Sequence, residues 1–394
     1  MAGRTSAVNR PLIDIGVNIR LLKVFGLLGV GGSARWPHQV YSGLVVAAFT
    51  LTVVPTFAAV LRDWGKDLNT VVDNTCLALP LFFSSVRCTY FICRRRDVTR
   101  LIAELLRFQE CAWPGAAAAE RASIMAGTSR LSRATTVFFN FLGVLMFATI
   151  SGSPVLAATR RHPFAAEYLL FDHRCSPCFE AVYAFQVACL FLIIFSIIAF
   201  DTMCMVLLMH GGAQFDVLSA ALRKVRGPAL VQLEQDAIPR HSDTQPRLLL
   251  DLHMRQSLVR CVQRHNDIIE FVKKLNDVYN PVMLGLIVYS MTMIALTSFR
   301  ATESSSEVGD LLKYAVLSST CIFELYLFCR LCHDILQRSQ GVVVAAFYCD
   351  WCDAGVEVNG IVRMIIARAN KPVRLSAGRF RIMSVETFAA VRTL

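Results

Sequence analysis

Charged residues are scarce in this chain, and their scarcity argues against a wholly water-soluble fold. Asp, Glu, Lys and Arg make up 18% of the 394 residues, whereas soluble proteins usually carry about a quarter. Hydrophobic residues reach 55%, so part of the apolar surface has to face something other than water. The composition predicts an integral membrane protein rather than two or three soluble domains.

Motifs for catalysis, glycosylation and export are also missing. The chain has no Walker loop, His-Glu-x-x-His, Gly-x-Ser-x-Gly or dinucleotide fingerprint, so we predict no enzyme and no cofactor. It contains no Asn-x-Ser/Thr sequon and no evident cleavable signal peptide. The apolar run Leu21–Gly32 is too short to span a membrane and contains Lys23, which favours an interfacial helix.

Long hydrophobic blocks are the main feature that is present. A membrane-spanning helix needs roughly 20 mostly apolar residues. A seventh block begins near Ile382 and reaches Leu394, where the sequence ends, after only 13 residues. We therefore predict an all-α membrane protein, a seven-helix bundle whose seventh helix is truncated. The six longer blocks are Val40–Leu61, Val71–Ile92, Ala134–Leu156, Ala181–Met209, Pro281–Phe299 and Leu311–Cys332.

Lys and Arg alternate along the chain in step with these blocks. With a cytoplasmic N-terminus, the inner segments hold 30 of the 40 Lys and Arg residues and the outer loops hold six. Because positive charge is enriched on the cytoplasmic side, this distribution predicts that the N-terminus is inside. The net charge of +11 then faces anionic membrane lipids, and its scattered distribution argues against a nucleic-acid partner.

The division of the chain follows from this topology. Residues 1–39 form a cytoplasmic N-terminal segment, and residues 40–332 form the six-span bundle. Within the bundle, the inner loop 210–280 has apolar residues at helical spacing, so we expect the fourth and fifth spans to continue as helices beyond the membrane. Residues 333–381 form a second cytoplasmic region, and residues 382–394 begin the seventh helix.

Two Cys-x-x-Cys pairs occur among the 14 cysteines. Cys175 and Cys178 lie in an outer loop beside His173, whereas Cys349 and Cys352 lie in an inner segment. Zinc sites built from such pairs need a second pair nearby, which neither has. A disulfide between Cys175 and Cys178 is geometrically awkward, so we predict no metal site and thiols that pack as small apolar groups.

The outer half of the predicted bundle is rich in Phe, Tyr, Met and Leu, with a few small polar residues. Ligand sites between helices have this composition, because an apolar lining holds the ligand and a few polar groups orient it. The composition of this outer half suits a small, mostly apolar ligand. The candidate lining residues are Phe83, Phe147, Ile150, Ser151, Tyr183, Gln186, Leu190, Met291, Tyr314 and Ser318.

The stretch 339–392 contains an ordered string of short motifs. They are Tyr348-Cys349-Asp350-Trp351, Met364–Ala369, Lys371-Pro372, Leu375–Gly378, Phe380 and Ser384–Phe388. This string resembles the C-terminal signature of insect odorant receptors. Weaker agreement with the family appears at Phe171-Asp172, at Asp201 and within His210–Leu218.

The resemblance implies an odorant-binding subunit of an odorant-gated cation channel in the plasma membrane of olfactory sensory neurons. Receptors of this family are similar in having seven spans and an inside N-terminus, and in assembling with a shared co-receptor as heterotetramers. A small volatile odorant is then the expected ligand, bound in the outer half of 40–332. The alternatives are a channel subunit like the sister gustatory receptors, or a non-enzymatic seven-helix receptor of another class.

The resemblance also assigns roles to the C-terminal region. It implies that 333–381 is an anchor region between subunits, with Val356–Asn370 as its helix. The last helix would line the pore, beginning at Ser384 and including Phe388 and Val391. That helix continues past the equivalent of the last residue here, so we expect an incomplete pore helix.

Four charged residues fall inside the expected spans, where charge is costly and often functional. One interpretation is that they pair with each other or reach the cytoplasmic interface. The other is a network that links ligand binding to channel opening. Asp73 and Glu167 lie near the outer face, where we expect both to be solvated. The four residues inside the spans are Arg87, Asp201, Glu324 and Arg330.

Overall fold

The described part of the computed structural model consists almost entirely of long helices. Its helices are α1 (Gly16–Val24), α2 (Trp36–Asp63), α3 (Leu68–Glu110), α4 (Gly115–Leu156), α5 (Cys178–Arg223), α7 (Pro246–Glu303), α8 (Val308–Phe347), α9 (Val356–Ala369) and α10 (Val385–Arg392). The described residues are 15–29, 36–65, 68–110, 115–156, 162–163, 166, 176–227, 229–230, 246–303, 308–378 and 381–392.

Within these residues, six helices are long and apolar enough to cross a membrane: α2, α3, α4, α5, α7 and α8. Each contains one of the six predicted blocks, so the prediction of an all-α, multi-pass membrane fold is confirmed. The seventh predicted helix corresponds to α10. One feature was not predicted, a small antiparallel hairpin of strands β1 (Ser376–Ala377) and β2 (Arg381–Ile382). Strands of two residues have no periodicity that a sequence pattern could reveal.

Several helices are much longer than a membrane is thick. Helix α5 has 46 residues and α7 has 58, which at 1.5 Å per residue makes them about 69 and 87 Å long. The hydrocarbon core of a bilayer is about 30 Å thick. The helical spacing noticed within 210–280 therefore corresponds to real helix, because α5 continues past Met209 and α7 begins at Pro246.

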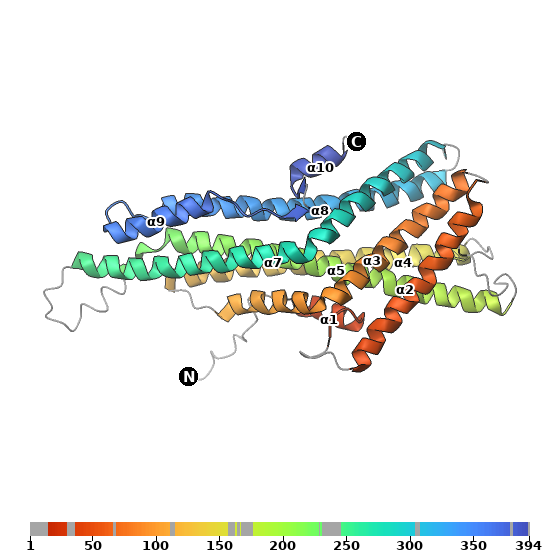
Figure 1. Ribbon diagram of the computed structural model, residues 1–394, viewed down its shortest axis with the longest axis horizontal. Helices are drawn as coiled ribbons and strands as arrows, with labels where there is room; N and C mark the ends of the chain where they lie inside the picture. The colour runs from red at the N-terminus through yellow and green to blue at the C-terminus, as the bar shows by residue number, and fades with distance from the viewer. Residues whose placement is uncertain are drawn as a thin grey trace, which may run out of the picture.

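Helix α5 is the centre of the bundle. Figure 1 shows α5, α7 and α8 running along the long axis, with α9 at one end beside α7 and α8. Helices α2 and α3 cross the other half at a steep angle. In the most apolar stretch of α5, 72% of the residues are buried, against 11% in α4. Most of the α4 stretch is thus left to face lipid or another subunit.

The short helix α1 packs against this bundle. Leu22 and Leu27 are fully buried, and Asn18 Nδ2 donates to Thr136 Oγ1 of α4 at 3.1 Å. After α1 the chain turns at Gly26, whose φ of +72° lies in the left-handed region that glycine tolerates. Helix α1 is thereby fixed to the membrane-spanning part of the chain.

Candidate functional site

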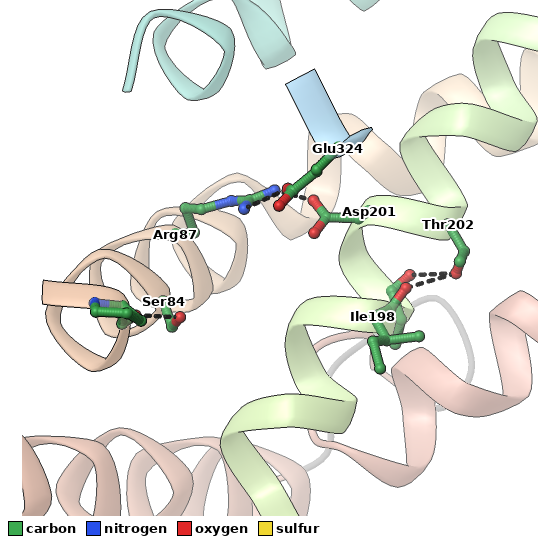
Figure 2. Close-up of polar contacts among 8 residues, drawn as sticks. Ser84, Arg87, Ile198, Asp201, Thr202 and Glu324 are labelled. Atoms are coloured by element: carbon green, nitrogen blue, oxygen red, sulfur yellow. Dashed lines mark hydrogen bonds and ion pairs between the residues drawn. The ribbon is translucent and has the colours of Figure 1, made fainter. Parts of the chain in front are cut away.

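Three of the four charged residues expected inside the spans meet in the bundle. Arg87 of α3 donates from Nη2 to Asp201 Oδ1 of α5, and its Nη1 lies 3.3 Å from Glu324 Oε1 of α8 (Figure 2). The side chains of Arg87 and Asp201 are 5% exposed, and that of Glu324 is 17% exposed. Buried charges need such partners, because removing them from water is costly. The prediction that these charges pair with each other is confirmed for these three.

Arg330, the fourth, does not join them. It pairs with Asp334 one turn further along α8, with Nη1 and Oδ1 3.2 Å apart, and its side chain is 46% exposed. Arg330 lies six positions after Glu324, a separation that turns the helix by about 240° beyond a full turn. The two side chains therefore point to different sides of α8.

Aromatic rings enclose the Arg87 guanidinium. Its Cζ lies 5.3 Å from the ring centroid of Phe83 and 5.0 Å from that of Phe200, distances at which a cation is attracted to a ring face. Phe83 in turn stacks on Tyr289 of α7, with centroids 4.8 Å apart. The candidate ligand residue Phe83 thus supports the ion cluster and links it to α7.

A second ionic cluster joins α3, α7 and α8 near the α7–α8 connection. Arg300 of α7 holds both oxygens of Asp73, with Nε 2.7 Å from Oδ1 and Nη2 3.0 Å from Oδ2. The buried Tyr314 also donates its hydroxyl to Asp73. The sequence predicts a solvated Asp73; its side chain is 34% exposed, and it is also held by these two partners. Sequence reasoning missed Arg300 because a basic residue after an apolar block is typical of a loop, whereas here it continues α7. Glu167 lies outside the described residues.

Several candidate ligand residues gather between α4 and α5. The Tyr183 hydroxyl donates to Ser151 O at 2.5 Å, and Ser151 Oγ donates to Phe147 O at 2.6 Å. Phe147 meets Phe191 edge to face, with centroids 5.6 Å apart. Ile150 is half-buried and packs against the same core. The structure therefore places Phe147, Ile150, Ser151 and Tyr183 in one region.

The remaining candidates are dispersed. Gln186 and Leu190 lie one turn apart on the buried face of α5. Ser318 is half-buried on α8, one turn from Tyr314. Met291 is 38% exposed. The candidates thus divide between the α4–α5 region and the α3–α7–α8 region.

The residues assigned to the pore helix begin α10. Ser384 is buried, and its Oγ accepts from Thr387 N at 3.3 Å, which caps the start of the helix. Phe388 meets Tyr326 of α8 edge to face, with centroids 5.3 Å apart. Val391 belongs to α10 by its backbone, and its side chain lies outside the described part.

The most specific sequence motif forms the turn after α8. Trp351 Nε1 donates to Phe347 O at 3.1 Å, which satisfies a carbonyl at the end of the helix. Asp350 has a φ of +52°, a conformation that Asp adopts more readily than most residues. Cys349 is buried and Cys352 is exposed. The motif thus has a structural role. In the other Cys-x-x-Cys pair, Cys175 lies outside the described residues, as does the neighbouring His173.

Within the part of the chain that the structure describes, the candidates belong to no metal-binding group and do not line the hollow between α4, α5 and α8. Among the described residues, no three His, Cys, Asp or Glu side chains are grouped to hold a metal ion. A hollow of about 380 Å³ lies between α4, α5 and α8, away from every candidate residue. Its lining includes the charged residues Glu120, Asp216, Arg223 and Arg338, which do not suit a small apolar ligand.

Comparison with known proteins identifies the family. The family model described as 7tm odorant receptor matches residues 67–394. This chain belongs to the odorant receptor family. The family comprises receptors rather than enzymes, and the chain is a multi-pass membrane protein.

Individual odorant receptors show the same relationship. The chain is 26% identical to odorant receptor 13a of Drosophila melanogaster over 148 residues, which cover 34% of this chain and 35% of that protein. It is 24% identical to the odorant receptor coreceptor of Anopheles gambiae over 143 residues, covering 36% of this chain and 30% of the coreceptor. The match with Drosophila odorant receptor 83a, 24% identical, covers 68% of this chain and 66% of that protein. The first two matches thus span about a third of each relative.

The fold agrees with a solved odorant receptor along nearly the whole chain. The insect olfactory receptor OR5 from Machilis hrabei superposes with a TM-score of 0.76, covering 96% of this chain and 97% of that one at 17% identity. The same receptor in complex with eugenol gives a TM-score of 0.74. At this identity the likeness establishes the fold alone.

Proposed function

We propose that this protein is the odorant-binding subunit of an odorant-gated cation channel. The observation that carries the proposal is membership of the odorant receptor family together with a fold shared along 96% of the chain with OR5. OR5 has been solved with eugenol bound, a small and mostly apolar molecule. A ligand of that class suits the Phe, Tyr, Leu and Ile side chains of the α4–α5 region.

We place the odorant beside the α4–α5 region, among Phe147, Ile150, Tyr183, Gln186 and Leu190. These residues supply apolar area, and Gln186 supplies a buried amide. The hydroxyl of Tyr183 is held by Ser151 O, so we expect its ring rather than its hydroxyl to contact the ligand. Phe83 is proposed as a second contact, because its ring stacks on Tyr289 of α7 and lies against the Arg87 guanidinium. Met291, Tyr314 and Ser318 are weaker candidates.

The ion cluster is suited to transmit binding across the bundle. Arg87 connects α3 to α5 and α8, and Phe83 extends the contact to α7. Helix α8 also carries Tyr326, which packs on Phe388 of α10. We infer that a ligand that shifts these helices acts on α10 through α8. We further propose a cytoplasmic N-terminus, a location in olfactory sensory neurons and assembly with the coreceptor as a heterotetramer.

The test is co-expression with the odorant receptor coreceptor of Anopheles gambiae, followed by current recording during application of volatile odorants, with eugenol as the first probe. The proposal predicts an odorant-evoked cation current that requires both chains. Cells that express either chain alone provide the controls. Absence of current for a broad panel, with both chains detected at the cell surface, would contradict the proposal.

A further inference from the structure

Asn280 binds the β1–β2 hairpin through its side-chain amide. Its Nδ2 lies 2.7 Å from Ser376 O, 2.8 Å from Ser376 Oγ and 2.9 Å from Gly378 O. Two of these oxygens are backbone carbonyls, which only accept hydrogen bonds. The amide of Asn280 therefore serves as a donor to this part of the hairpin.

Asn276, one turn earlier on α7, makes the complementary contact. The backbone N of Ser376 donates to Asn276 Oδ1 at 2.8 Å. Residues four apart lie on one face of a helix, so both amides reach the same strand. The two asparagines are half-buried and chemically identical, yet Asn276 accepts from the hairpin and Asn280 donates to it.

Leu284 completes this face of α7 one turn further on. Gly378 has a φ of +64°, and a Cβ atom built on it would lie 3.1 Å from Leu284 Cδ2. Glycine suits this position both because of its φ and because α7 approaches its backbone closely. The hairpin therefore contacts three successive turns of α7. We call this contact surface, formed by Asn276, Asn280 and Leu284, the seat of the hairpin.

The hairpin in turn fixes the start of α10. Met383 N donates to Leu375 O at 2.9 Å, and Thr387 Oγ1 donates to Ile382 O at 2.6 Å. These bonds leave little freedom between β2 and the first turn of α10. The seat on α7 therefore determines where α10 begins.

The seat lies where α7 changes direction. Pro281 follows Asn280 directly and has no N–H to donate, so the carbonyl of Asp277 loses its helical partner and the helix bends. Figure 1 shows α7 bending about midway along its length. A change in this bend moves the Asn280 side chain, and with it the hairpin.

We propose that Asn280 is a positioning residue that couples the bend of α7 to the placement of α10, and so sets how readily the channel opens. The coupling stands on the geometry alone. Its effect on opening rests on the proposed channel function.

The test compares Asn280→Asp with Asn276→Asp. At position 280 the aspartate removes the donor and places its oxygens against the carbonyls of Ser376 and Gly378. At position 276 the same substitution keeps the acceptor for Ser376 N. Both variants are expressed at full length, and their surface abundance is measured. Hydrogen exchange of the purified protein reports on residues 374–388, and odorant-free current with the Anopheles coreceptor reports on opening, after subtraction of the current of coreceptor alone.

We expect Asn280→Asp to exchange about tenfold faster or more in this segment, since loss of these bonds removes local protection. Its odorant-free current per surface receptor should differ from wild type at least about twofold, while Asn276→Asp matches wild type in both measurements. Equal exchange in the two variants would show that the hydrogen bonds donated by Asn280 do not hold the hairpin on α7. Faster exchange in Asn280→Asp with an unchanged odorant-free current would show that Asn280 holds the hairpin but does not influence channel opening. If wild type gives no current with any odorant, the channel function fails, and the exchange result still decides the seat.

Discussion

Arg87 of α3 and Asp201 of α5 form an ion pair within the apolar blocks, and each side chain is 5% exposed. Glu324 approaches the same guanidinium, so one positive group faces two carboxyl groups. The three residues are therefore not equivalent. Arg87 is the shared partner, whereas Glu324 is the more exposed and the more distant acid.

We expect Arg87→Ala to destabilise the protein by about 3–5 kcal/mol, because it leaves two carboxyl groups without their cation. Glu324→Gln should change stability by less than about 1 kcal/mol, since the Arg87–Asp201 pair is kept. Arg330→Ala is the matched control, as it removes an exposed arginine that also has an acidic partner. Thermal unfolding in detergent and surface abundance measure the difference. Similar losses for Arg87→Ala and Glu324→Gln would contradict this account.

The sequence predicted the spans because the bilayer imposes a length and an apolar composition on each of them. It predicted the meeting of Arg87, Asp201 and Glu324 in part, because a buried charge needs a partner and few were available. It did not predict that Arg300 reaches Asp73. That contact depends on how far α7 continues and how α3 is rotated, and neither is encoded in hydropathy.

The ligand site was harder to predict for a related reason. A sequence gives the depth of a residue along a span but not the face that looks inward. Gln186 and Leu190 are on the buried face of α5, whereas Met291, at a comparable depth in α7, is exposed. The hairpin seat was missed because Asn276 and Asn280 look like ordinary polar residues at the end of a span. Only the fold brings Ser376 to them.

Cys349 and Cys352 should differ sharply in reactivity. Burial raises the pKa of the Cys349 thiol to about 11, whereas Cys352 is exposed. The thiolate is the reactive form, so little of Cys349 is reactive near neutral pH. We expect N-ethylmaleimide to label Cys352 of the folded, purified protein at pH 7.5 and to leave Cys349 unmodified. Labelling of Cys349 should increase as the pH approaches 11, or after denaturation.

Mass spectrometry of the tryptic peptide 339–363, which contains both cysteines, localises the label. Denatured protein at pH 7.5 is the control, and both residues should react in it. Equal labelling of the two residues in the folded protein would show that Cys349 is not protected by burial.

The charge distribution predicts that the N-terminus is cytoplasmic, since the inner segments hold 30 of the 40 Lys and Arg residues. One epitope tag is inserted at Ala7 and another directly after Glu167. Antibody should stain intact cells through the second tag only, and permeabilised cells through both. Staining of the Ala7 tag in intact cells would reverse the topology.

Tyr183 offers the most direct test of the odorant site, because its ring and its hydroxyl have separable roles. Tyr183→Phe removes only the bond to Ser151 O, which should cost about 1 kcal/mol of stability and leave the ring in place. Tyr183→Ala removes the ring as well. If the ring contacts the odorant, the alanine variant should need about tenfold more odorant for a half-maximal current, a change of about 1.4 kcal/mol. The phenylalanine variant should respond like wild type.

Gln186→Ala tests the same face of α5 one turn away, where the side chain is fully buried. We expect it to shift the response mainly for odorants that carry a hydroxyl or carbonyl group, because only these can use the amide. Dose–response curves are normalised to surface abundance, which separates ligand contact from loss of folded protein. Leu331→Ala, which removes a core-packed side chain on α8 outside the proposed site, is the control for general packing damage. If Tyr183→Ala and Gln186→Ala both keep the wild-type curve, the odorant binds elsewhere, and the α3–α7–α8 candidates around Phe83 become the next to test.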